Sequence, residues 1–342
     1  MKIGMVFGNG LIPQGELNEQ NLIYARQLGV SDIVLHLPDA SILPSTSDGF
    51  WTVDDLVRVK KYVAGFNLNL SAIENFPVTH WFDILLDGPE KIKQMELLKK
   101  TIKNLGIAGI SSMGYYFSLA GVWGRKYGPY ARGGALVDAF SAEEMDDINR
   151  PINVGEVWGM EYTSVNFEKN IGKVEKEEMW QRLEYFLINL VPVAEEANVR
   201  LAAHPDDPPI SMLRNTYRIL TDPLDFDRLL NIYPSYHNGL EFCQGTISYM
   251  ANGNLYDAIK KYAKNNIVYV HLRNNSGKFP DYHETFLDDG DWDILKCLKL
   301  YKENGFEGVI VPDHAPEVKF SSSAHVGFAH SIGFLKAGLL SI

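Results

Sequence analysis

Short apolar runs alternate with longer amphipathic segments along almost the whole chain. Eight of these runs are rich in Val, Ile, Leu, Phe or Tyr and are bounded by turn residues, which is typical of buried strands. The predicted strands are Lys2–Phe7, Asp32–Leu37, Asn67–Ile73, Ile110–Tyr116, Arg200–Ala203, Gly239–Phe242, Ile267–Leu272 and Val309–Val311. The segments between them carry apolar residues every three or four positions, as helices do. The predicted helices are Glu16–Leu28, Gly88–Leu105, Lys176–Ala197 with a kink at Pro192, Leu255–Ala263, Trp292–Asn304 and Ser323–Leu339.

This alternation predicts an α/β fold with a parallel sheet. Eight strands favour a closed (β/α)8 barrel, the TIM barrel, with long loops at its C-terminal face. The alternative, an open doubly wound sheet with a dinucleotide site, would show a GxGxxG loop after the first strand. The first strand leads only to Gly8 and Gly10, without a third glycine at that spacing. We therefore expect residues 1–342 to form one TIM-barrel domain.

Two long connections interrupt the regular alternation. Residues 116–167 are rich in Gly, Tyr and Trp and separate the fourth predicted strand from its helix. In a barrel this connection lies at the catalytic end, so we expect it to act as a lid. Its Trp123 and Arg125 would either cover the pocket or pack within the loop. The second connection, His204–Asp222, is proline-rich and follows the fifth strand, where such length predicts a functional loop.

Charge and composition narrow the classes of partner. The 342-residue chain has 32 Lys and Arg against 43 Asp and Glu, a net charge of −11. This balance argues against nucleic acid or an anionic membrane as a partner, and an anionic substrate would need a local positive site. We find no signal-peptide pattern and no run of about 20 apolar residues that would span a membrane. Two cysteines exclude a disulfide framework and favour a reducing, cytoplasmic location, with Cys297 expected in a helix core.

Side chains that commonly bind metals follow four successive predicted strands. They are His204, Cys243, His271 and Asp313, each about one strand–helix unit from the next. Strands of a closed barrel deliver their C-terminal residues to one face, so we expect these side chains to surround one pocket. Two imidazoles, a thiolate and a carboxylate suit zinc, iron(II) or manganese. Taken singly, Cys243 would more often be a small core residue and His271 a hydrogen-bonded core histidine.

Other candidate residues stand beside this set. Arg273 and Asn274 follow the third strand-end residue, and Arg273 would pair with a substrate carboxylate or form a salt bridge at the rim. His314 adjoins the fourth residue and is a candidate general acid or base. Glu74 and Asn75 end the third strand, where they would bind a sugar hydroxyl or cap the following loop.

These residues stand in motifs that resemble the mannonate dehydratase family, a branch of the xylose-isomerase-like barrels. The motifs are ENFPV at 74–78, HPDDPP at 204–209, GLEFCQGT at 239–246, VYVHLRN at 268–274, HETFLDDGDWD at 283–293 and PDH at 312–314. The resemblance covers most of the chain. It implies a (β/α)8 fold, a manganese or iron(II) cofactor and dehydration of D-mannonate to 2-keto-3-deoxy-D-gluconate in hexuronate catabolism. It also implies that His204, Cys243, His271 and Asp313 bind the metal.

Dehydration of a sugar acid needs two proton transfers and a bound carboxylate. The C2 proton leaves to a base, and an acid assists loss of the C3 hydroxyl. We expect His314 to carry one of these transfers, and Arg273 and Asn274 to orient the substrate. The candidates for the second acid–base group are Tyr115, Tyr116 and His283.

The chain departs from the family pattern near its last motif. Val311 stands where the family typically has arginine, Ala315 and Pro316 stand where a glycine follows, and residues 327–330 lack a tyrosine. These departures keep open a metal-dependent sugar isomerase or epimerase, and a sugar-binding barrel without catalysis. The expected partner in every case is a small sugar acid or sugar. A homo-oligomer also stays open, because the aromatic residues of the long loop suit an interface as well as a lid.

Overall fold

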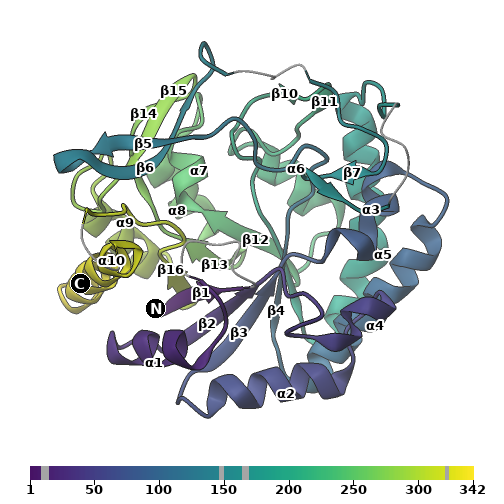
Figure 1. Cartoon of the computed structure of the whole chain (residues 1–342), viewed down its shortest axis with the longest axis horizontal. Coiled ribbons are helices and arrows are strands. Elements are labelled where there is room, and N and C mark those ends of the chain that lie inside the picture. The colour runs from purple at the N-terminus through teal and green to yellow at the C-terminus, as the bar shows by residue number, and fades with distance from the viewer. Residues whose placement is uncertain (9–14, 146–149, 164–168, 320–322) are drawn as a thin grey trace.

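Eight strands close into a single parallel barrel, as the alternation of strands and helices predicts (Figure 1). The computed structural model describes residues 1–8, 15–145, 150–163, 169–319 and 323–342. Around the wall, neighbouring strands follow the order β1-β16-β13-β12-β9-β4-β3-β2. Their bounds are β1 Lys2–Phe7, β2 Asp32–His36, β3 Asn69–Glu74, β4 Ser112–Tyr115, β9 Arg200–Ala203, β12 Asn238–Cys243, β13 Ile267–His271 and β16 Val309–Val311. The expected TIM barrel is therefore confirmed.

The strands lie where the apolar runs predict them, with differences at their ends. β3 begins at Asn69 because Asn67 has a left-handed φ of 57° and belongs to the turn before the strand. β12 continues to Cys243, which pairs in register with His271 of β13. The barrel thus presents these two side chains next to each other at the carboxyl ends of neighbouring strands. Gly10, which the sequence analysis weighed as part of a glycine-rich loop, lies outside the described residues.

Helices pack around the barrel (Figure 1). Their bounds are α1 Glu19–Gln27, α2 Val53–Ala64, α3 Val78–Leu86, α4 Lys91–Ala108, α5 Lys176–Ala197, α6 Asp225–Ile232, α7 Gln244–Ser248, α8 Leu255–Tyr262, α9 Ile294–Glu303 and α10 Ser323–Leu340. The sequence prediction missed α2, α3, α6 and the short α7. For α2 the signal was present, since Thr52 caps the helix and Leu56, Val59 and Val63 form its buried face. Among the described residues, no helix is long and apolar enough to cross a lipid bilayer.

The buried apolar residues form one large cluster, a smaller one within the barrel strands and two small ones that include residues of the four-stranded sheet described below. The large cluster includes Trp51, Trp81 and Trp180 and joins the strands to the surrounding helices. The smaller cluster consists mostly of short side chains: Val6, Val34, Ala72, Ala202, Val268, Tyr269, Val309 and Val311. Short side chains leave room for buried polar groups between the strands, and the candidate site uses that room.

Two loops at the carboxyl end of the barrel combine into a four-stranded antiparallel sheet (Figure 1). Its order is β14-β15-β6-β5, with the bounds β5 Lys126–Ala131, β6 Ala135–Ser141, β14 Asn274–Lys278 and β15 Asp281–Thr285. The predicted lid at 116–167 therefore contributes two strands that pair with the loop after β13. Residues 146–149 and 164–168 of this insertion lie outside the described residues. The short hairpins β7 Glu156–Val157 with β8 Met160–Glu161, and β10 Met212–Leu213 with β11 Thr216–Tyr217, complete the loops.

Candidate active site

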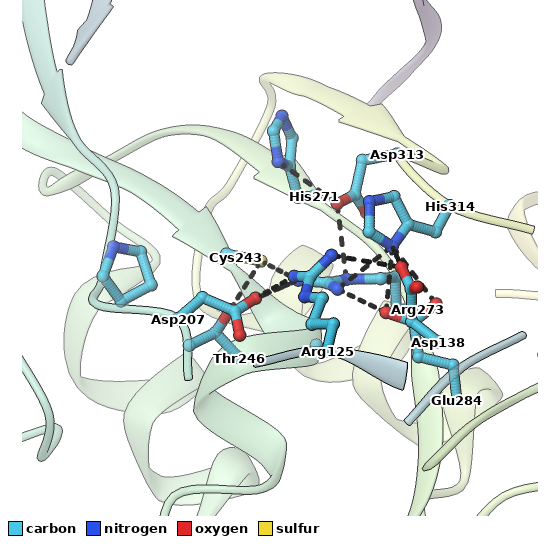
Figure 2. A network of polar contacts seen from close by, with 12 residues as sticks. Arg125, Asp138, Asp207, Cys243, Thr246, His271, Arg273, Glu284, Asp313 and His314 are labelled. Carbon is cyan, nitrogen blue, oxygen red and sulfur yellow. Dashed lines mark hydrogen bonds and ion pairs between the residues drawn. The ribbon is translucent and has the colours of Figure 1, made fainter. Parts of the chain in front are cut away.

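The four predicted ligands come from four successive barrel strands. His204 follows β9, Cys243 and His271 end β12 and β13, and Asp313 follows β16. One ligand atom from each of His204, Cys243 and His271 lies within 4.8 Å of the other two. Asp313 Oδ2 lies 3.6 Å from His271 Nδ1, and Figure 2 shows the two side chains facing each other. The structure thus brings the predicted set together.

His271 is held in place by a buried carboxylate. Its Nε2 lies 3.0 Å from Glu74 Oε2, and Glu74 Oε1 lies 2.6 Å from His36 Nδ1. Burial disfavours the charged form of Glu74, but His271 and His36 outweigh burial and hold the pKa of Glu74 well below its usual value. The opposite nitrogen, His271 Nδ1, is buried and makes no hydrogen bond. A carboxylate on one side of an imidazole and a free nitrogen on the other is the arrangement of a metal-binding histidine, so the residues fit a divalent ion.

The surroundings of Cys243 favour its thiolate form. Burial alone would raise the pKa of its thiol, but Arg273 and His204 outweigh burial and hold that pKa well below its usual value. Arg273 Nη2 donates to the sulfur at 2.8 Å and the Thr246 hydroxyl donates at 3.1 Å. Gly245 permits this approach, because a Cβ at that position would overlap the Arg273 guanidinium. A thiolate is the form of cysteine that binds metals.

Arg273 is buried among acidic partners (Figure 2). Its Nη1 donates to Glu284 Oε1 at 2.5 Å, its Nη2 lies 3.4 Å from Asp207 Oδ2, and its Nε lies 3.3 Å from Asp313 Oδ2. From its place in the sequence, Arg273 would either pair with a substrate carboxylate or form a salt bridge at the rim. It lines the cavity described below, but its nitrogens already face side chains of the protein. Its direct effect is to hold Cys243 and Asp313 in position.

Asn274 was expected to contact the substrate, but its side chain contacts the protein backbone. Its side-chain amide donates to the carbonyl oxygens of Leu287 and Trp292, at 3.0 and 2.9 Å. Asn274 is buried and does not line the cavity, whereas Arg273 does. The contacts of Asn274 therefore tie the loop after β15 to the start of β14.

His314 forms a pair with a carboxylate from the inserted sheet. Its Nδ1 lies 2.9 Å from Glu284 Oε1 and 3.4 Å from Asp138 Oδ2 (Figure 2). Burial favours the neutral ring, but Glu284 outweighs it and raises the pKa of His314 above its usual value. Because Glu284 occupies Nδ1, Nε2 is the nitrogen left for proton transfer, as in other histidine–carboxylate pairs.

A cavity of about 140 Å³ lies among these groups. Most of the residues that line it have polar side chains; the lining consists of Val6, His36, Glu74, Asn75, Tyr116, Val122, Arg125, His204, His271, Arg273, Asp313 and His314. Such a lining suits a small molecule with many hydroxyl or carboxylate groups. Arg125 and Arg273 bring positive charge to a chain that is acidic overall.

The remaining candidates divide between the cavity and the protein interior. Tyr116 lines the cavity, and Arg218 Nη2 donates to its hydroxyl. Tyr115 is buried, lies outside the lining, and packs on Phe186 with ring centroids 4.9 Å apart. His283 lies in β15 and is also outside the lining.

Trp123 and Arg125, which were expected either to cover the pocket or to pack within the loop, take different positions. Arg125 lines the cavity and pairs with Asp207 and Asp138. Trp123 instead packs against Arg214, whose guanidinium carbon lies 4.3 Å from the centroid of the Trp123 ring. The insertion therefore contributes one charged side chain to the cavity, while its tryptophan packs within the loops.

Two acidic groups next to the predicted ligands were not among the residues predicted from the sequence. Asp207 is buried and accepts a hydrogen bond from the Tyr249 hydroxyl at 2.7 Å. Burial opposes its charge, but Arg125 and Arg273 outweigh burial and hold the pKa of Asp207 far below its usual value. Its place in HPDDPP, three residues after the predicted ligand His204, was the available signal. Glu241 stands two residues before Cys243, and a charged residue inside a buried strand was the signal there.

Comparison with known proteins adds a family to this geometry. Residues 13–336 match the family model described as D-mannonate dehydratase (UxuA). A protein named mannonate dehydratase from Endomicrobium trichonymphae is 30% identical over 319 residues, covering 87% of this chain and 84% of that protein. Another of that name, from Thermotoga maritima, is 30% identical over 287 residues, covering 77% of this chain and 78% of that protein.

Solved structures with the same fold include a crystal structure of mannonate dehydratase from Streptococcus suis serotype2. It superposes with a TM-score of 0.81 at 24% identity, covering 99% of this chain and 94% of that one. A structure of L-ribulose 3-epimerase superposes with a TM-score of 0.61 at 14% identity, covering 99% and 95% of the two chains. At these identities the superpositions support the barrel fold alone.

Proposed function

Because the chain belongs to the D-mannonate dehydratase family, we propose that it removes water from D-mannonate to form 2-keto-3-deoxy-D-gluconate. The observation that carries the proposal is the cluster of His204, Cys243 and His271, with Asp313 beside it, at the edge of a small polar cavity. We place the reaction in the cytoplasm, in hexuronate catabolism.

The proposed cofactor is Mn²⁺ or Fe²⁺, held by His204, Cys243, His271 and Asp313. When bound, such an ion supplies a Lewis acid for the carboxylate and a neighbouring hydroxyl of the substrate. The mixture of nitrogen, sulfur and oxygen donors supports a transition metal over Mg²⁺ or Ca²⁺, which prefer oxygen ligands alone.

His314 is the proposed proton-transfer residue. Its Nε2 takes the C2 proton or protonates the leaving C3 hydroxyl, while Glu284 fixes the ring through Nδ1 and stabilises the imidazolium. Loss of the C2 proton and the C3 hydroxyl forms an enol and water, and the enol then tautomerises to the 2-keto acid. Tyr116 is the proposed second acid–base group, since it alone of the three candidates lines the cavity.

Arg125 and Arg273 are proposed to attract the substrate carboxylate by their positive charge, while Arg273 keeps its contacts with Cys243 and Asp313. Both guanidinium groups line the cavity and share Asp207 as a partner. Val311 stands where the family typically has arginine and brings no charge. Arg125 and Arg273 would supply the missing positive charge. Asn274 then supports the site indirectly, through the loop contacts described above.

The test is turnover of D-mannonate by the purified protein after metal removal and reloading with Mn²⁺ or Fe²⁺. Formation of a 2-keto-3-deoxy acid, detected by its periodate–thiobarbiturate product, is the expected result. A His314→Ala variant that still binds the metal should lose this product. Failure to dehydrate any aldonate, together with interconversion of ketoses, would overturn the proposal in favour of the isomerase or epimerase alternative.

A further inference from the structure

Glu241 is a buried carboxylate on the strand that ends at Cys243. Side chains two residues apart on a strand point to the same side, so Glu241 and Cys243 both face the other proposed ligands. Glu241 is only 1% exposed. A carboxylate so deeply buried is stable only with strong partners, which makes its contacts informative.

The two oxygens of Glu241 have different surroundings. Oε2 accepts a hydrogen bond from the Tyr269 hydroxyl at 2.5 Å. Oε1 accepts no hydrogen bond and lies 3.4 Å from His271 Nδ1 and 4.0 Å from His204 Nε2. His271 Nδ1 makes no hydrogen bond either. A buried oxygen and a buried nitrogen, both able to bind a cation, therefore face each other beside a second imidazole.

The barrel is shaped to hold Glu241 in this position. Tyr269 stands beside Glu241 in the register of β12 and β13, and its hydroxyl fixes Oε2. Gly114 of β4 makes room for the pair, because a Cβ there would overlap the Tyr269 hydroxyl and Glu241 Oε2. With Oε2 fixed by its neighbour, Oε1 is directed at the imidazoles.

We propose that Glu241 is a fifth ligand, binding through Oε1 to the same ion as His204, Cys243, His271 and Asp313. Ligands on one ion, at bond lengths of about 2.0–2.3 Å, lie about 3 Å apart when adjacent and up to about 4.5 Å apart when opposite. The separations from Oε1 to the two histidines, 3.4 and 4.0 Å, fall within that range. This inference rests on the proposed metal site and adds to it a ligand that the family motifs did not indicate.

A second cation is the main rival occupant. Glu74, Glu241 and His271 also offer ligand atoms within 4.8 Å of one another. However, Glu74 already contacts His36 at 2.6 Å and His271 at 3.0 Å, and a cation among the three residues would compete with both contacts. Glu241 Oε1 and His271 Nδ1 can bind an ion without losing a hydrogen bond, whereas Glu74 cannot, which favours one ion over two.

A fifth ligand has a chemical consequence for the site. Three of the five ligands, Cys243, Asp313 and Glu241, would be anionic and would outweigh the charge of a divalent ion. Five protein ligands leave one position open on a six-coordinate ion such as Mn²⁺, and exclude the four-coordinate tetrahedral arrangement that structural zinc adopts. With one position open, the substrate carboxylate and hydroxyl would bind the ion together only if a protein ligand left, whereas a four-ligand site has room for both.

The direct test is a crystal structure of the wild-type protein loaded with Mn²⁺, together with the metal content per chain. One ion per chain with Glu241 Oε1 at a bonding distance of about 2.2 Å is the expected result. One ion with Oε1 beyond about 3 Å would overturn the inference. Two ions per chain, one of them held by Glu74 and Glu241, would replace it with a two-ion site.

A matched pair of variants tests the same ligand in solution. Glu241→Gln should weaken Mn²⁺ binding at least tenfold, measured by isothermal titration, with folding checked by circular dichroism. Asp32→Asn is the control, since Asp32 is another buried barrel carboxylate whose partners, Lys2, Ser31 and Ser71, lie outside the site. Its Mn²⁺ affinity should stay within twofold of wild type. Equal affinity in the Glu241→Gln and wild-type proteins would contradict the inference.

These outcomes separate the ligand from the proposed reaction. A protein that binds Mn²⁺ through Glu241 but does not dehydrate D-mannonate would retain the fifth ligand and lose the proposed function. A protein that dehydrates D-mannonate with Glu241 away from the ion would retain the proposed function and lose the fifth ligand.

Discussion

The Nδ1 atom of His314 lies 2.9 Å from Oε1 of Glu284, although the two residues come from different loops of the barrel. Glu284 belongs to β15 of the inserted sheet and His314 follows β16. Glu284 also accepts a hydrogen bond from Arg273 at 2.5 Å, so one carboxylate connects the proposed acid–base group to the arginine beside the thiolate. Figure 2 shows these groups as one continuous network.

Replacing Glu284 by glutamine should slow catalysis while leaving substrate binding nearly unchanged. The amide removes the charge that stabilises the His314 imidazolium and the acceptor that orients the ring. We expect kcat on D-mannonate to fall by about 100-fold, with KM within threefold of wild type. Steady-state kinetics of the Mn²⁺-loaded variant measures both constants. An unchanged kcat would show that His314 does not depend on this carboxylate.

Protonation of Glu284 should also make the folded protein less stable at acid pH. Burial raises its pKa, but His314 and Arg273 outweigh burial and lower the pKa to about 2, from a usual value of 4.5. Since the folded-state pKa is the lower one, the stabilisation is complete above about pH 4.5 and is lost as the pH falls toward 2. The contribution amounts to about 3 kcal/mol.

Urea unfolding of the metal-free protein between pH 7 and pH 3 measures this acid effect. The free energy of unfolding should fall less steeply with pH in Glu284→Gln than in wild type, because the variant has no carboxylate to protonate there. Parallel pH curves for the two proteins would contradict the assignment.

The two cysteines should behave oppositely toward metal. Cys243→Ser removes a thiolate ligand and should weaken Mn²⁺ binding by about 100-fold or more, since even changes beyond the direct ligands weaken affinity 10–100-fold. Cys297 is a matched control: it is equally buried, lies in α9, and burial raises the pKa of its thiol to about 12. Metal analysis after dialysis should find wild-type content in Cys297→Ser. Full metal content in Cys243→Ser would remove that residue from the site.

A buried ion pair should hold the loop after β9 against the insertion. Arg218 Nε lies 3.0 Å from Asp206 Oδ1, both side chains are at most 2% exposed, and Arg218 Nη1 donates to the Gly121 carbonyl at 2.9 Å. Arg218→Met leaves Asp206 buried without its cation, so we expect unfolding to become easier by about 3–5 kcal/mol. The surface pair of Arg228 with Glu177 is the control, and Arg228→Met should leave the urea midpoint unchanged. Equal midpoints for the two variants would refute the role of the buried pair.

The amino-acid sequence by itself determined the barrel and the placement of four candidate ligands at successive strand ends. Alternating strand and helix periods admit few architectures, and a closed parallel barrel brings the C-terminal ends of its strands to one face. For that reason His204, Cys243, His271 and Asp313 could be named from spacing and residue type, without knowledge of any contact.

Only the tertiary structure decided how the loops complete the site. The pairing of β6 with β15 joins two loops far apart in the sequence, and it places Glu284 against both His314 and Arg273. The tertiary structure also decided that Arg273 faces carboxylates of the protein. It likewise decided that Tyr269, on the next strand, binds one oxygen of Glu241 and leaves the other without a hydrogen bond. Hydrophobic periodicity records which face of an element is buried. It does not record which distant side chain lies opposite, because that depends on strand register and loop packing, which form only when the whole chain folds.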